Sequence, residues 1–303
     1  MKLCNTKPKL IVQLMGGLGN QMFQYATARS IAERNDMQLV LDTWSGFVRD
    51  FQYNRHYELG AFPINAREAT QIERLPFWID RFSSKLRKVT PREINKHWYG
   101  VFINETQNEF LPKIFEHQSE ASCWMIGYWQ SGKYFAEHES LIKQELSPPI
   151  PSDPHFFELG NRIRSVNSVA LGLRLYEEIK NPAINVANPH IKLVESINQA
   201  ISAMTDKQPS CHFFIFCTHR SPVLDQLDLK GDVTFVTGDD GYEGTLQTFW
   251  LLTQCRHHII TNSSYYWWGT WLSSNHYAPE EQVVFAANKF VNKDSILPQW
   301  NLF

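Results

Sequence analysis

The sequence lacks any long run of apolar residues. Its first ten residues, MKLCNTKPKL, contain no apolar segment of signal-peptide length, and no stretch approaches the roughly 20 apolar residues that a spanning helix needs. Internal repeats and low-complexity tracts are absent as well. We therefore expect a cytoplasmic protein.

Cysteine is scarce, and neither sign of charge dominates. The five cysteines are odd in number and far apart, which favours a reducing compartment and argues against a disulfide framework or a structural zinc site. A net charge of −2 and a pI near 6.6 give no sign of the clustered basic excess typical of nucleic-acid binding. We expect no nucleic-acid partner.

Aromatic residues, in contrast, are abundant. They make up 14% of the chain, including 10 Trp, in a composition that is otherwise typical of a soluble folded protein. Aromatic side chains suit the flat apolar faces of sugars, although any single one is more expected in a core. The 303 residues suffice for one large or two ordinary domains.

A glycine turn near the N-terminus is the most informative local feature. Apolar Ile11–Met15 leads into Gly16-Gly17-Leu18-Gly19, and an amphipathic helical pattern begins at Asn20. Backbone N–H groups at such a helix start favour an anion, most often a phosphate. The spacing matches neither the phosphate loop nor the dinucleotide fingerprint, so the turn could also serve only to close a βα unit.

A proline-rich stretch divides the chain. Four of the ten residues from Ser147 to Phe156 are proline, which is typical of a linker. We therefore predict an N-terminal domain over 1–146, a linker over 147–154 and a C-terminal domain over 155–303. Strands and helices alternate on both sides, so the fold class is α/β, with a cleft expected between the halves.

In the N-terminal half, the patterns predict a strand over 38–41 that ends in Asp42, a polar helix starting at Arg67, a strand over 123–127 and a helix from Tyr134 to about 146. Asp42 lies where α/β sheets place ligands, but it could equally cap a turn.

Residues 77–96 form a basic segment in which six Lys and Arg residues follow Phe77 and Trp78. Such a segment could make peripheral contact with the inner face of a membrane or with a charged glycan; a solvated surface helix is the alternative.

In the C-terminal half, polar residues follow three predicted strands. Strands are expected over 168–173, 212–216, 233–236 and 258–260, and helices over 191–204 and 244–254. The carboxyl ends of such strands converge at one crevice. Arg174, Thr218-His219 and Asn262-Ser263-Ser264 would meet there, although singly each could be a salt-bridge partner, a surface residue or a helix cap.

Three motifs carry a family resemblance. Gly16–Tyr25, Gly127–Ser131 and Asn262–Leu272 resemble, in order and spacing, the bacterial α-1,2-fucosyltransferases of glycosyltransferase family 11. The resemblance implies a GT-B fold, in which two Rossmann-like domains face a central cleft. It also implies metal-independent, inverting transfer of L-fucose from GDP-L-fucose to the 2-hydroxyl of a terminal galactose, in O-antigen or surface polysaccharide synthesis.

The resemblance assigns the donor mainly to the C-terminal half and the galactoside acceptor mainly to the N-terminal half, with no cofactor besides the donor substrate. Arg174 and Glu177 are the expected catalytic residues. The expected donor-binding residues are Gly17, Gly19, Asn20, Gln21, Arg174, Thr218, His219, Asn262, Ser263 and Ser264. The expected acceptor-binding residues are Asp42, Tyr128, Trp129 and Gln130.

The general base is left open among Glu177, Glu178 and Asp42, because an inverting transfer needs a carboxylate near the acceptor hydroxyl. Asp239-Asp240 is expected to form a turn between glycines, and His257-His258 to be structural.

The central motifs depart from the family pattern. His-x-Arg-Arg-x-Asp becomes Gly172–Glu177, Ser-Asp-Asp becomes Cys217-Thr218-His219, and Thr248 replaces an aspartate. Two alternatives therefore stay open: another GDP-sugar donor such as GDP-colitose, or a non-catalytic protein that binds a glycan or nucleotide.

Overall fold

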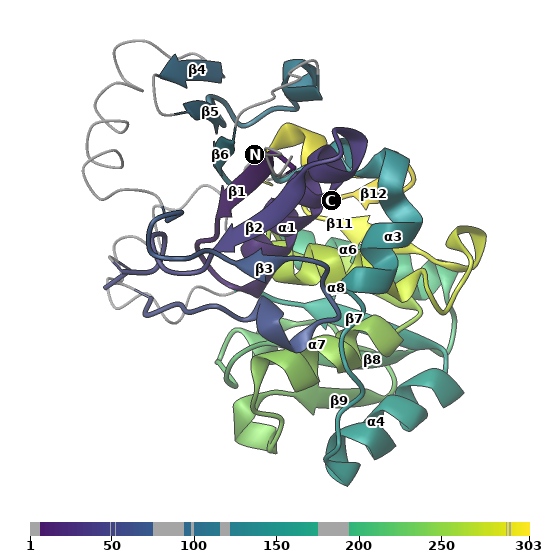
Figure 1. Cartoon of the computed structure of the whole chain (residues 1–303). Helices are drawn as coiled ribbons and strands as arrows, with labels where there is room; N and C mark the ends of the chain where they lie inside the picture. The colour runs from purple at the N-terminus through teal and green to yellow at the C-terminus, as the bar shows by residue number, and fades with distance from the viewer. Residues whose placement is uncertain are drawn as a thin grey trace, which may run out of the picture. The chain divides into compact units, whose positions relative to one another are not determined.

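The chain consists of two compact units, Met1–Leu146 and Ser147–Phe303 (Figure 1). The computed structural model describes residues 7–48, 50–51, 53–74, 94–97, 100–115, 122–174, 194–288, 290 and 292–303. The proline-rich stretch opens the second unit. Its last part starts a helix, because the Asp153 side chain accepts a hydrogen bond from the His155 N–H and Pro154 occupies the first turn.

The first unit is built on a six-stranded sheet in the order β3-β2-β1-β6-β5-β4. The strands are β1 Lys9–Gln13, β2 Gln38–Asp42, β3 Arg67–Glu68, β4 Ile94–His97, β5 Gly100–Asn104 and β6 Cys123–Ile126. Only β4 runs antiparallel to its neighbour among these strands. The strands predicted over 38–41 and 123–127 are confirmed.

The polar helix predicted from Arg67 is wrong. Arg67 and Glu68 form the edge strand β3, in parallel register with Val40 and Leu41 of β2. The chain then turns at Thr70, whose N–H donates to Glu73, and Glu73 also holds the Arg67 guanidinium. Pairing with a neighbouring strand has overridden a weak local pattern.

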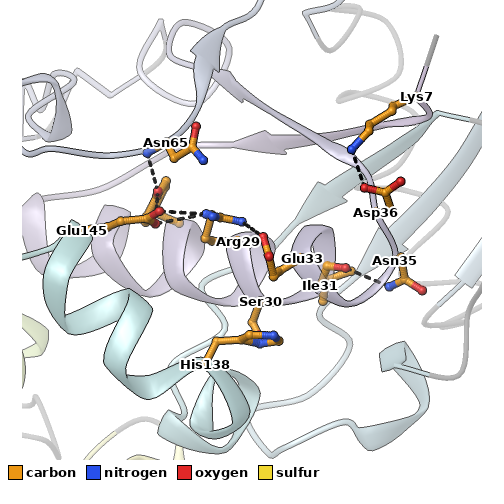
Figure 2. Close-up of polar contacts among 11 residues, drawn as sticks. Lys7, Arg29, Ser30, Ile31, Glu33, Asn35, Asp36, Asn65, His138 and Glu145 are labelled. Atoms are coloured by element: carbon orange, nitrogen blue, oxygen red, sulfur yellow. Dashed lines mark hydrogen bonds and ion pairs between the residues drawn. The ribbon is translucent and has the colours of Figure 1, made fainter.

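Helix α1 (Leu18–Arg34) starts two residues before the predicted Asn20 and is buried on nearly all sides rather than amphipathic. Several of its polar side chains are paired within the unit. The Tyr25 hydroxyl donates to Glu145 at 2.6 Å, and the Arg29 guanidinium lies between Glu145 and Glu33 (Figure 2). These contacts fasten α1 to the end of α3 (Glu139–Glu145).

The predicted helix over 134–146 is only partly regular. Its first part consists of two short 3-10 turns, η3 Gly132–Tyr134 and η4 Ala136–His138, before α3 begins. Two further 3-10 turns, η1 Leu59–Ala61 and η2 Pro112–Phe115, lie in the loops of this unit.

The second unit holds a sheet in the order β12-β11-β10-β7-β8-β9, with every pairing parallel. The strands are β7 Ser168–Gly172, β8 His212–Phe216, β9 Val233–Val236, β10 His257–Ile260, β11 Val284–Ala286 and β12 Asn301–Leu302. Counted along the chain this is the order 3-2-1-4-5-6 of the Rossmann fold. The four strands predicted here are confirmed to within one residue.

The helices of this unit are α4 Pro154–Ser165, α6 Val194–Lys207, α7 Thr245–Gln254 and α8 Ser264–Ser273. The short 3-10 turns are η5 Leu224–Gln226, η6 Gly238–Asp240, η7 Pro279–Glu281 and η8 Lys293–Ser295. Strands β7, β8 and β10 are buried along their whole length, as expected for a parallel sheet covered on both faces.

Both units are thus α/β, which confirms the predicted class and its pair of Rossmann-like domains. Within the ranges given above, no helix combines the length and apolarity needed to cross a bilayer.

Candidate functional site

The second unit has its topological switch point at β7, which lies between β8 and β10. Ligands of open α/β sheets bind outside the carboxyl ends of the strands at this point. The backbone N–H of Arg174, just after β7, donates to the Thr261 hydroxyl at 2.7 Å. That hydroxyl donates in turn to the Gly172 carbonyl at 3.0 Å, so the chain segments after β7 and β10 are joined at one edge.

The N-terminus of α8 lies at this same edge. Ser263 is its N-cap residue, but its side chain makes no capping hydrogen bond to the helix. The Ser263 N–H donates to the Thr261 carbonyl at 2.7 Å. The structure therefore brings Arg174 and the predicted Asn262-Ser263-Ser264 turn to adjacent strand ends.

Tyr266 of α8 packs against these strand ends. Its hydroxyl lies 3.0 Å from the Leu173 carbonyl oxygen and 2.9 Å from that of Phe216, and it can donate to either. A Cβ atom placed on Gly172 would lie 2.6 Å from the Tyr266 ring. The absence of a side chain at Gly172 thus leaves room for the Tyr266 ring. Their packing positions the backbone that leads to Arg174.

Thr218 and His219 follow β8, but they contact residues on its other side, after β9. The Thr218 carbonyl accepts from Gly238 at 3.1 Å, and His219 Nδ1 lies 3.8 Å from Asp239 Oδ1. The predicted turn at Asp239-Asp240 is confirmed, since it forms η6 with Gly241 in a left-handed conformation (φ 84°).

An ion pair between Arg220 and Asp240 lies on this side of the sheet edge. The Arg220 guanidinium and the Thr237 hydroxyl hold the pKa of Asp240 below its usual value. Asp240 therefore stays charged and paired, which fixes the loop that carries His219.

In the first unit, the glycine turn follows β1 as predicted. Gly17 is the N-cap of α1, and its carbonyl accepts from the Asn20 N–H at 2.9 Å. Gln21 is fully buried, and its side-chain amide donates to the carbonyls of Gly16 and His56. It also accepts from the Glu58 N–H. Gln21 therefore holds the glycine turn in place. Its effect on ligand binding would be indirect, through the position of the turn.

The glycine turn is tied to the loop after β6, the strand beside β1. Gln130 donates to the Asn20 side chain at 2.8 Å. In the same loop, Trp129 is fully buried with φ of 56°, whereas Tyr128 is 42% exposed. Of the predicted acceptor-binding residues, Tyr128 thus presents its ring to solvent and Trp129 is part of the core.

Asp42 is fully buried at the end of β2. Its carboxylate accepts the backbone N–H groups of Trp44 at 3.2 Å and Ser45 at 2.9 Å, so it caps the turn that follows. Because Asp42 is also fully buried, it has no exposed surface that an acceptor hydroxyl could reach.

Two functional candidates carried no sequence signal. The Arg55 guanidinium lies against the glycine turn, since its Cζ would be 3.8 Å from a Cβ on Gly17. Glu105, after β5, accepts the N–H groups of Tyr128 at 2.7 Å and Trp129 at 3.1 Å. The contact of Glu105 with the Tyr128 loop could have been predicted only from the pairing of β5 with β6.

Other predicted residues lie outside the description. Glu177, Glu178 and residues 77–93 of the basic segment lie outside the described residues, and only the backbone of β4 is described from the remainder of that segment.

The predicted structural role of His257 and His258 is confirmed. His257 contacts Asn167 and Val283, and His258 contacts the Cys255 carbonyl and Ser273. Burial lowers the pKa of His257 to about 4 and that of His258 to about 3. Across the described ranges, no three His, Cys, Asp or Glu side chains come close enough together to hold a metal ion.

A doubly wound sheet with an arginine and a helix N-terminus directly after the strands at its switch point is typical of enzymes that bind nucleotides. The family model for glycosyl transferase family 11 matches residues 9–303. The chain therefore belongs to glycosyl transferase family 11, and the predicted membership is confirmed.

Individual relatives are distant. An α-1,2-colitosyltransferase of Escherichia coli is 26% identical over 279 residues, covering 88% of both chains. The O-antigen biosynthesis glycosyltransferase WbnK of Escherichia coli is 24% identical over 299 residues, covering 91% of this chain and 93% of that one. The fucosyltransferase NodZ from Bradyrhizobium is 18% identical with a TM-score of 0.49, covering 87% of this chain and 93% of that one.

Proposed function

We propose that this protein is an inverting glycosyltransferase that moves L-fucose from GDP-L-fucose to the 2-hydroxyl of a terminal galactose, without a metal ion, in the synthesis of an O-antigen or other surface polysaccharide. Family membership supports the reaction class. The observation that carries the assignment to this chain is the junction of Arg174, Thr261 and the start of α8 at the switch point.

The chemistry follows from the charge that develops in the reaction. As the bond between the sugar and the diphosphate breaks, the leaving GDP gains negative charge. A guanidinium offers a planar pair of donors to phosphate oxygens, and a helix N-terminus offers N–H groups. Donors that are already in position stabilise this charge at little reorganisation cost. In this proposal Arg174 and the first turn of α8 supply them.

A second donor remains a specific alternative. The relative named an α-1,2-colitosyltransferase, together with the departures at Gly172 and Cys217–His219, favours a test of GDP-colitose beside GDP-L-fucose. In this proposal the same switch-point residues would bind either donor.

The deciding experiment is to incubate the purified protein with GDP-L-fucose, GDP-colitose and a galactoside, singly and together, and to analyse the products by mass spectrometry. We expect one deoxyhexose residue to be added; a colitosyl product would be lighter by one oxygen. NMR of the product would give the linkage and the anomeric configuration. Thermal stabilisation by GDP with no transfer from any donor would instead identify a binding protein.

A further inference from the structure

The proposed reaction needs a group that takes the proton of the acceptor hydroxyl. Of the three residues expected for this role, Glu177 and Glu178 lie outside the described residues. Asp42 caps a buried turn. We propose that Glu105 is the general base, acting at an acceptor-sugar subsite formed with Tyr128 and Tyr53. This inference rests on the proposed function and adds the residue that activates the acceptor.

The sheet brings Glu105 to the correct edge. It directly follows β5, which pairs in parallel with β6, and β6 pairs in parallel with β1. The segments after these three strands therefore emerge at one edge. They carry Glu105, the Tyr128 loop and the glycine turn, and the Gln130 to Asn20 hydrogen bond joins the last two.

The carboxylate of Glu105 is held in one orientation. It accepts the N–H groups of Tyr128 and Trp129 at 2.7 and 3.1 Å. A Cβ on Gly127 would lie 2.4 Å from the Glu105 Cβ, so a glycine there, with φ of 151°, permits this close approach. Each carboxylate oxygen has two lone pairs. The two backbone bonds therefore orient the group and leave it able to accept a proton.

The surroundings suit a sugar. Tyr128 is 42% exposed and Tyr53 37% exposed, so both offer aromatic surface of the kind on which sugar rings pack. Burial, and then the charges of Asp50 and Glu105, raise the pKa of Tyr128 above its usual value. The Asp50 carboxylate in turn accepts the backbone N–H groups of Tyr53 and Arg55 at 3.1 Å. Arg55, beside Gly17, also lies near the Tyr53 ring, at 5.7 Å from its centroid.

The pKa of Glu105 also suits the role of a general base. Burial raises the pKa of its carboxyl above the usual value, against the lowering effect of the Tyr128 and Trp129 N–H groups. The pKa values of Glu33, Glu73 and Asp240 are lowered instead, because each of these carboxylates is paired with an Arg. A base works best when its pKa lies close to the working pH.

The step is balanced without a further reactant. The O–H bond of the galactose hydroxyl breaks and its proton passes to Glu105. The oxygen forms a bond to the anomeric carbon of the donor sugar, and the bond from that carbon to the diphosphate breaks with its electron pair leaving on GDP.

The test compares Glu105→Gln with Glu109→Gln, a matched change at an exposed carboxylate four residues further on. We expect Glu105→Gln to lower kcat by about 10²- to 10⁴-fold, while thermal stabilisation by GDP is unchanged. The wild-type and Glu109→Gln enzymes should share an acid limb in the pH profile of kcat/KM, and Glu105→Gln should lack it. Formate should partly restore transfer to Glu105→Ala.

Three results would overturn the assignment. One is a Glu105→Gln enzyme that keeps more than half of the wild-type kcat. Another is a raised KM for the galactoside with an unchanged kcat and pH profile, which would make Glu105 only a positioning residue. If the variants do not fold, the wild-type profile still decides, because an absent acid limb excludes this base. Failure of the proposed function is distinct, since then the wild-type protein itself would form no product.

Discussion

At the scale of single residues, Gly172 stands where the family signature places a histidine, and Tyr266 packs against it. Gly172 has no side chain, and the Tyr266 ring occupies the space above it, with its hydroxyl at the ends of β7 and β8. The departure at Gly172 therefore has a steric counterpart on α8. The sequence pattern alone could not have indicated this pairing of distant positions.

The steric pairing makes a stability prediction. Gly172→Ala should lower the free energy of unfolding by about 1–3 kcal/mol, because the new methyl group meets the Tyr266 ring. In a Tyr266→Ala background, the same change should cost much less. A double-mutant cycle by urea unfolding measures the difference. Equal costs in both backgrounds would contradict the steric explanation.

Arg174 makes the most direct prediction for catalysis. Arg174→Ala should reduce kcat/KM by about 10²- to 10³-fold, since it removes a donor for the charge on the leaving diphosphate. Arg174→Lys should recover only part, because an ammonium cannot bind two oxygens in the same fork geometry. Lys230→Ala, at an exposed cation of the same unit, is the control and should keep full activity. Steady-state kinetics with GDP-L-fucose as the donor give the comparison.

At the scale of elements, local patterns predicted the strands well and the polar contacts poorly. Strands β2, β8 and β9 were predictable because each is a short apolar run with clear ends. Arg67 was mispredicted because its strand exists only through pairing with β2. Glu105 carried no signal because its contact depends on which strand lies beside β5, a property of the sheet and not of the segment.

The buried contacts of α1 give an element-scale prediction. Glu145→Ala should cost about 3–5 kcal/mol of unfolding free energy, because it leaves Arg29 buried without this partner and removes the acceptor of the Tyr25 hydroxyl. Glu137→Ala, which breaks an exposed pair with Arg34, should cost at most about 1 kcal/mol. Chemical unfolding of the two variants gives the comparison; similar costs would show that the network of Figure 2 contributes little.

The two histidines of β10 predict a pH dependence of stability. Both are buried as neutral rings, with pKa values of about 4 and about 3 against an ordinary value of 6.5. The unfolded chain therefore binds more protons than the folded one between these values. Stability should fall as the pH drops below about 6.5 and should continue to fall to about 4 or 3.

Unfolding of wild type and His258→Gln at pH 7 and pH 5 tests this dependence. The variant should lose less stability between the two pH values, because it removes one of the two buried titrating rings. His219→Gln, at a histidine whose side chain is 63% exposed, is the control and should retain the wild-type slope. An unchanged slope in His258→Gln would contradict the prediction.

At the scale of the whole molecule, the chain is two separate α/β units that meet at residues 146 and 147. Each has its own sheet and core. We therefore predict that a fragment of residues 147–303 folds alone and keeps GDP binding, with weaker affinity than the full chain. Calorimetry should show one cooperative transition that GDP shifts upward. A fragment without a transition would show that the second unit depends on the first.

The buried character of α1 has a consequence for how the protein can be altered. A helix that is enclosed on nearly every side tolerates few replacements, and the glycine turn is continuous with it. Libraries that test the proposed acceptor subsite are therefore better directed at the exposed residues Tyr53 and Tyr128 than at the Gly16–Tyr25 motif. Variation within that motif would mostly return protein that misfolds.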